Sequence, residues 1–134
     1  MSFIELKGIE NAREPEVAPE GEYSLCIINA KVQEKEGKTN IMNVLEIEGE
    51  PEMGNVFHYV SIPGPDDEDD KVKAKMLFAR RFFTQFGIDV DGGVDTEQFV
   101  GSRALCKLTQ EEYPEGSGQL KNVLQVNRLP QEED

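Results

Sequence analysis

Apolar residues gather in five short stretches of the chain, separated by turns that contain glycine or proline. In most of these stretches apolar and polar residues alternate, and a period of two is typical of β-strands with one buried face. The stretches lie at 22–33, 39–50, 56–62, 102–113 and 121–129. The pattern therefore predicts five strands.

The first stretch changes its apolar phase partway along. Tyr23, Leu25 and Ile27 alternate, but Ile28 and Ala30 continue the apolar series on the other phase. A phase change within one strand indicates a β-bulge or a sharp coil. Small barrels need such a feature where one strand serves two sheets.

The third stretch, 56–62, is apolar on both faces. One face holds Val56, His58, Val60 and Ile62, and the other holds Phe57, Tyr59 and Ser61. Since neither face is clearly polar, the sequence leaves open which of them points toward solvent.

Residues 65–87 begin with an acidic run and continue as an amphipathic helix. At the helical period its apolar positions share one broad face, made of Val72, Met76, Ala79, Phe82, Phe83 and Phe86. The acids from Asp66 to Asp70 are expected to cap the helix and fill its first turn, where the helix dipole favours negative charge. Gly87 is a typical stop, so the helix is predicted from about Lys71 to Phe86.

The predicted order is three strands, one helix and two strands. This is the order of an OB-fold, a five-stranded Greek-key barrel, here with the helix plugging one end. A β-sandwich with one helix is the alternative. We assign residues 1–18 to an N-terminal arm, 19–130 to the OB-fold domain and 131–134 to an acidic tail.

Composition narrows the class of protein. The 134 residues suit one domain, and the net charge of −13 argues against indiscriminate attachment to polyphosphates or anionic membranes. A local basic groove is still compatible with that charge. No apolar run approaches the length of a membrane span. Cys26 and Cys106 lie in strand-like runs and are expected to be buried, reduced thiols of a cytoplasmic protein.

The sequence offers no catalytic or metal-binding constellation. It contains no nucleophile motif or phosphate loop, and His58 is its single histidine, so we expect neither an enzyme nor a cofactor. Asp89, Asp91 and Asp95 share the spacing of a calcium loop, but Val94 stands where that loop requires glycine. We therefore expect no metal site.

With no catalytic or metal-binding constellation, the function that the sequence favours is binding at a surface. An OB-fold binds single strands across its second and third strands and the adjoining loops, using cations for phosphates and flat side chains for bases. The candidates for phosphates are Lys31, Lys35, Lys38, Arg103, Lys107 and Lys121, and the candidates for bases are Phe57, Tyr59 and Tyr113. Asn40 and Asn43 add polar groups on the second strand.

Short motifs within residues 17–129 resemble the small bacteriophage single-stranded-DNA-binding proteins that have an OB-fold. The motifs are a Pro-x-Gly-x-Tyr opening at Pro19, Gly21 and Tyr23, a Gly-Lys turn at Gly37 and Lys38, and a Val-Gly step at Val100 and Gly101 before the fourth strand. The resemblance implies a non-enzymatic protein that coats or protects single-stranded DNA during phage replication or recombination. It also implies a location in the cytoplasm of an infected bacterium.

The acidic tail extends this resemblance. Glu132, Glu133 and Asp134 are similar to the acidic tips by which such proteins recruit replication and recombination partners, although the aromatic residue that ends the best-known tips is absent.

The net charge supports a second hypothesis. A chain with 27 acidic residues and 14 basic ones also suits a protein-binding adaptor or inhibitor that binds no nucleic acid, a class that includes DNA mimics.

Overall fold

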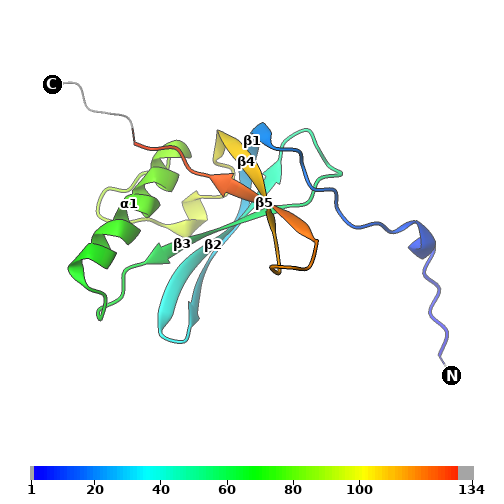
Figure 1. Cartoon of the computed structure of the whole chain (residues 1–134), viewed down its shortest axis with the longest axis horizontal. Helices are drawn as coiled ribbons and strands as arrows, with labels where there is room; N and C mark the ends of the chain where they lie inside the picture. Colours follow the sequence, from blue (N-terminus) through cyan, green and yellow to red (C-terminus); the bar gives the residue numbers. More distant parts are fainter. Residues whose placement is uncertain (1, 130–134) are drawn as a thin grey trace.

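The computed structural model describes residues 2–129, which form one antiparallel sheet and one α-helix (Figure 1). The strands are β1 (Gly21–Lys35), β2 (Lys38–Ile47), β3 (Val56–Ile62), β4 (Arg103–Glu112) and β5 (Leu120–Gln125). The helix α1 (Asp69–Gln85) lies between β3 and β4, and two short 3-10 turns, η1 (Ile9–Asn11) and η2 (Thr96–Gln98), complete the elements. The predicted β class and the position of the helix are confirmed.

The sheet has the order β3-β2-β1-β4-β5, so β3 and β5 are its two edges. The sheet curls until these edges approach each other, but no hydrogen-bonded pairing among residues 2–129 joins them. The strands are therefore a curled, open sheet rather than a closed barrel. No helix in this part of the chain has both the length and the apolar character that crossing a membrane requires.

The bulge predicted in the first strand is confirmed. The register between β1 and β2 shifts between Ile27 and Asn29. On one side of this point Gly21 to Cys26 pair with β4, and from Leu25 onward β1 pairs with β2. The bulge thus lets one strand bend and serve both halves of the sheet.

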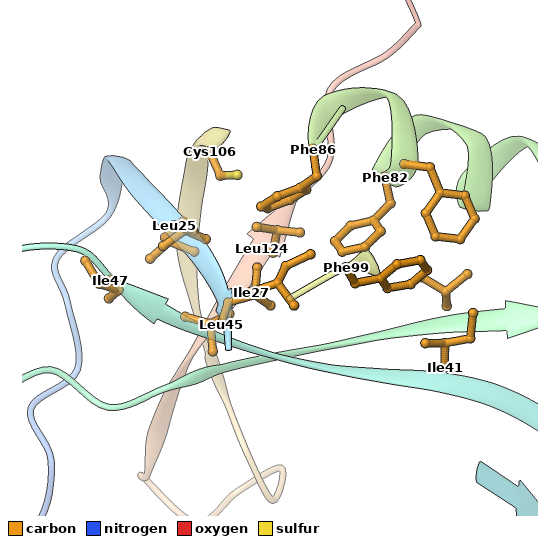
Figure 2. Packing of buried hydrophobic residues seen from close by; sticks show 14 of the residues in the cluster. Leu25, Ile27, Ile41, Leu45, Ile47, Phe82, Phe86, Phe99, Cys106 and Leu124 are labelled. Atoms are coloured by element: carbon orange, nitrogen blue, oxygen red, sulfur yellow. The ribbon is translucent and has the colours of Figure 1, made fainter. Parts of the chain in front are cut away.

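The core lies between the inner face of the sheet and α1 (Figure 2). Phe82 and Phe86 project from the helix toward sheet residues that include Ile27 and Leu124, and the two rings lie 4.9 Å apart between centroids. Phe99, which follows η2, packs 5.4 Å from Phe83. The sequence therefore predicted correctly that Phe82, Phe83 and Phe86 would be buried.

One residue of the predicted helix face is placed differently. Met76 is 58% exposed, whereas Ala79, Phe82 and Phe83 are buried. The fully buried residues of α1 all lie in its C-terminal half, and Val72 near its start is only half-buried. The prediction that Met76 belongs to the core was wrong, because the fully buried part of the helix begins after it.

The acidic run before α1 is used in two ways. Asp69 and Asp70 occupy the first turn, as predicted. The N-cap residue is Glu68, and its side chain accepts no capping hydrogen bond. Asp67 instead organises the preceding turn, because its Oδ2 accepts a hydrogen bond from the Gly64 N–H at 2.8 Å. The capping role predicted for the run is therefore not what the structure shows.

The chain before β1 is attached to the sheet at Ala18. The Ala18 N–H donates to Asn122 Oδ1 at 2.8 Å, and the Ala18 carbonyl accepts from Asn122 Nδ2 at 2.8 Å and from Gln110 Nε2 at 2.9 Å. Glu16 forms a parallel bridge with Met53. The end of the N-terminal segment is thus fixed against β4 and β5.

Candidate nucleic-acid interface

The outer face of β1, β2 and β3 gathers most of the predicted binding residues. Residues that are paired across neighbouring strands point to the same side of a sheet. Lys31 pairs with Met42, which pairs with Tyr59, so these three form one row. The next rows hold Gln33, Asn40 and Ser61, and then Lys35 and Lys38. We call the surface made by these rows and Phe57 the outer face.

The structure decides which side of β3 faces solvent. Phe57 and Tyr59 are 52% and 54% exposed, whereas Val56 and Val60 are buried. The aromatic pair therefore points outward, and the valines contribute to the core. Two flat rings, separated by one residue on the same strand, are thus open to a ligand.

A groove extends from this aromatic pair to the hairpin of β4 and β5. It has a volume of about 590 Å³, and its lining includes Phe57, Tyr59, Tyr113, Leu120 and Lys121, together with residues 15–17 and 54–55. The Lys121 Nζ lies 4.4 Å from the centroid of the Tyr113 ring. Predicted residues from distant parts of the chain are therefore brought together here, in an arrangement of rings beside a cation.

The lysines of the first hairpin have no compensating acid among the described residues. Within residues 2–129, no carboxylate oxygen lies within ion-pair distance of Lys31, Lys35 or Lys38. Lys121 of β5 also forms no ion pair, although Glu111 is its cross-strand partner. The charges of the hairpin lysines are therefore available to an anionic ligand, even though the chain as a whole is strongly negative.

Arg103 and Lys107 lie apart from this group. Both are exposed on β4, where Arg103 pairs with Cys26 and Lys107 with Glu22. The Arg103 Nε lies 3.2 Å from a carboxylate oxygen of Glu48, and Glu48 also accepts a hydrogen bond from Ser24. The structure thus places neither of these two predicted cations on the lining of the groove, and only Arg103 forms an ion pair among the described residues.

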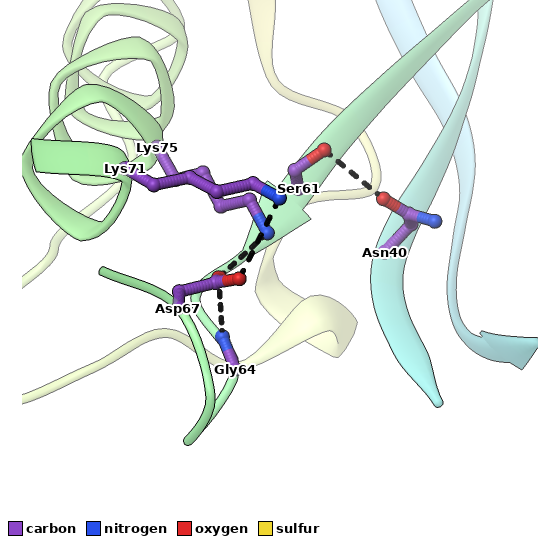
Figure 3. A network of polar contacts seen from close by, with 6 residues as sticks. All are labelled: Asn40, Ser61, Gly64, Asp67, Lys71 and Lys75. Carbon is purple, nitrogen blue, oxygen red and sulfur yellow. Dashed lines mark hydrogen bonds and ion pairs between the residues drawn. The ribbon is translucent and has the colours of Figure 1, made fainter. Parts of the chain in front are cut away.

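A polar network marks the end of the outer face near α1 (Figure 3). Ser61 Oγ donates to Asn40 Oδ1 at 3.2 Å. Beside it, the carboxylate of Asp67 forms ion pairs with Lys75 Nζ at 2.8 Å and with Lys71 Nζ at 3.7 Å. The hydrogen bond from Lys75, followed by that from the Gly64 N–H, lowers the pKa of Asp67 to about 2.

This network joins the acidic run before α1 to lysines of the helix itself. Asp67 orients two lysines of the helix toward the end of β3. Lys71, Lys75 and Tyr59 all line a second hollow between β3 and α1. Sequence reasoning missed these two lysines because helix periodicity cannot reveal which strand the helix approaches. Met42, Gln33 and Ser61 were also missed, although counting the strand register could have found them.

Asn43 does not belong to the outer face. It lies three residues from Asn40, so in a strand the two side chains point to opposite sides. Asn43 is fully buried, and its Nδ2 donates to the carbonyls of Ile41 at 3.3 Å and His58 at 3.1 Å. The expectation that it adds a polar group to the binding surface was wrong.

His58 and the two cysteines pack within the fold and not on the outer face. The His58 ring stacks on Phe82 with 4.7 Å between centroids, and burial lowers the pKa of His58 to about 4. Cys26 and Cys106 are free and buried, as predicted. Burial raises the pKa of Cys106 to about 12, so its thiol stays protonated at neutral pH.

Two acids of the loop after α1 accept hydrogen bonds from backbone N–H groups two residues farther along the chain. Asp89 Oδ1 accepts from the Asp91 N–H, and Asp95 Oδ1 accepts from the Glu97 N–H, both at 3.0 Å. The predicted partner-binding residues Glu132, Glu133 and Asp134 lie outside the described residues.

Comparison with known proteins adds no relative to this picture: neither a protein-family model nor a curated protein matches the chain. The functional argument therefore rests on the residues and their arrangement.

Proposed function

We propose that this protein has an OB-fold and binds single-stranded DNA on the outer face, acting by binding and not by catalysis. The observation that carries the proposal is the exposure of Phe57 and Tyr59 beside unpaired lysines, on the strands that OB-folds use for nucleic acid. Burying these rings against the core would have been the more stable use of two aromatic residues.

The geometry supplies the two interactions that a single strand requires. Bases stack on aromatic rings whatever their sequence, and phosphates are neutralised by cations that follow the backbone. The groove offers Phe57, Tyr59 and Tyr113 for stacking, with Lys121 at one end and Lys31 in the Tyr59 row. A duplex hides the faces of its bases, so this arrangement favours unpaired strands.

The OB-fold part of the proposal rests on connectivity and curvature. The helix follows the third strand, β1 bends at its bulge, and the edges β3 and β5 approach each other. These features are those of a partly open five-stranded barrel.

The biological setting in the proposal comes from the sequence motifs. We propose that the protein coats or protects single strands during phage replication or recombination in the cytoplasm of the infected bacterium. The acidic tail would then recruit replication or recombination proteins.

Fluorescence anisotropy tests the proposal. A labelled oligo-dT and a duplex of the same length are titrated with the full chain at low and at moderate salt. We expect binding to oligo-dT that weakens as salt rises, and much weaker binding to the duplex. Absence of binding at low salt would overturn the proposal in favour of an acidic adaptor or inhibitor, which the net charge of −13 would suit.

A further inference from the structure

The first part of the N-terminal segment, residues 2–12, exposes large apolar side chains. We call this part the apolar arm. Phe3 is 92% exposed, and Ile4, Leu6 and Ile9 are all more than half exposed. The backbone hydrogen bonds found for residues 6–12 join the arm only to itself. Four apolar side chains in water, on a segment held to the sheet only farther along the chain, indicate a surface that is covered by something else.

A second apolar surface lies on α1, at the other end of the molecule. Here β3, the helix and the segment after β5 surround a hollow of about 400 Å³, whose lining includes Val60, Ala74, Phe78 and Val126. Phe78 is 63% exposed. We call this the α1 hollow. Its walls are mostly apolar, so water is a poor occupant for it.

Cations border the α1 hollow. Lys71 and Lys75 lie on its lining and share a single carboxylate, that of Asp67. The guanidinium of Arg81 lies 5.3 Å from the centroid of the Phe78 ring, at the edge of the hollow. The hollow thus combines apolar walls with an excess of positive charge, although the chain as a whole is acidic.

We propose that the apolar arm of one copy of this protein docks in the α1 hollow of a second copy. The arm is apolar, and its acids Glu5 and Glu10 outnumber its one base, Lys7. It therefore complements the α1 hollow in both polarity and charge. Figure 1 shows the arm and α1 at opposite ends of the long axis of the molecule, so the contact is head-to-tail.

A head-to-tail contact leaves a free arm on one copy and a free hollow on the other. Such a heterologous interface adds further copies until a ring closes or a filament forms. The proposal does not rest on binding of DNA, because self-association is measured with protein alone.

Size-exclusion chromatography with light scattering, over a wide range of protein concentration, tests the proposal. We expect the average mass of the wild type to rise with concentration. Phe3→Ser removes an anchor from the arm and Phe78→Ser removes one from the hollow, and each should weaken self-association about ten-fold or more, the usual effect of one buried aromatic residue. Val32→Ser is the matched control, because Val32 is 51% exposed and lies on neither surface.

Mixing the two variants separates a head-to-tail contact from other arrangements. The Phe3→Ser copy keeps its hollow and the Phe78→Ser copy keeps its arm, so the mixture should form a one-to-one dimer that cannot grow. A mixture that stays monomeric, or a Phe3→Ser variant that still assembles, would overturn the proposal, and so would a wild type that is monomeric throughout. If Phe78→Ser lowers the melting temperature, Ala74→Glu replaces it, because Ala74 is an exposed residue of the hollow.

Discussion

The two faces of β3 carry residues of similar hydrophobicity that have opposite environments. Val56 and Val60 are buried, and His58 between them stacks on Phe82 of α1. Phe57 and Tyr59 point the other way, and about half of the surface of each stays open to solvent. The inner face therefore explains stability, whereas the outer face does not. An apolar residue indicates binding only when the fold has left it without a packing partner.

Truncating Phe82, the helix residue that stacks on His58 of the inner face, should have the largest effect on stability. Phe82 is fully buried among His58, Phe83 and Phe86. Phe82→Ala is expected to lower the free energy of unfolding by about 3–5 kcal/mol, measured by urea denaturation. Met76→Ala, an exposed position on the same helix, should leave it nearly unchanged. Equal losses in the two variants would contradict the division between packed and exposed faces.

Protonation of His58 should also act on the inner face. Burial lowers the pKa of His58 from 6.5 to about 4, so the unfolded chain binds its proton more readily than the folded chain. Above pH 6.5 His58 is neutral in both states and does not reduce the free energy of unfolding. As pH falls toward about 4 the unfolded chain takes up the proton first, and the free energy of unfolding drops by about 3 kcal/mol.

Comparison with His58→Leu isolates this effect from the many carboxylates. The difference in unfolding free energy between wild type and variant should change between pH 6.5 and about 4 and then level off. Asp67→Asn is the control, because the pKa of Asp67 is lowered to about 2 and its contribution is lost only below about pH 3.8. A wild-type curve parallel to that of His58→Leu would show that His58 is not linked to folding.

A substitution on the outer face should weaken DNA binding without changing the stability of the protein. Tyr59→Ala is expected to weaken binding to oligo-dT by about 1–3 kcal/mol, the usual contribution of one stacked base, with little change in its salt dependence. Its melting temperature should match the wild type, since the ring is exposed. Leu105→Ala, exposed on β4, provides the control. Normal binding together with early melting would place Tyr59 among the structural residues.

The smallest predicted effect is on the salt dependence of DNA binding, and it should differ between Lys31 and Lys107. Lys31 shares the Tyr59 row, whereas Lys107 is paired with Glu22 on β4. Lys31→Ala should reduce the magnitude of the slope of log K against log salt by about 0.7, the value for one phosphate on a single strand. Lys107→Ala should change it less. A larger change for Lys107 would move the path of the strand to the other half of the sheet.

Much of the fold could be predicted because it depends on local pattern. Alternation located the strands, and the phase change at Ile28 located the bulge. The pattern failed at Met76, which shares the apolar face of the helix by period but is exposed, because burial depends on what packs against each position and not on period alone. Whether β3 and β5 pair could not be predicted either, because the curvature of the whole sheet determines it.

The candidate site was predictable in composition but not in arrangement. Phe57, Tyr59 and the hairpin lysines were predicted to belong to one surface, and the strand register puts Lys31 and Tyr59 in the same row of it. The side of β3 that faces solvent depends on where α1 packs, which no short stretch of sequence encodes. The separation of Arg103 from the groove likewise depends on long-range pairing of β4 with β1.

The shared strand β1 also has a consequence for the time course of folding. Leu25 pairs with Ile47 on one side and with Ala104 on the other, so one residue joins a near neighbour and a very distant one. The β1–β2–β3 meander closes short loops, whereas pairing of β4 must wait until a long loop closes at a greater entropic cost. We therefore expect the meander to be ordered early, and the arrival of β4 on the first half of β1 to set the rate of folding.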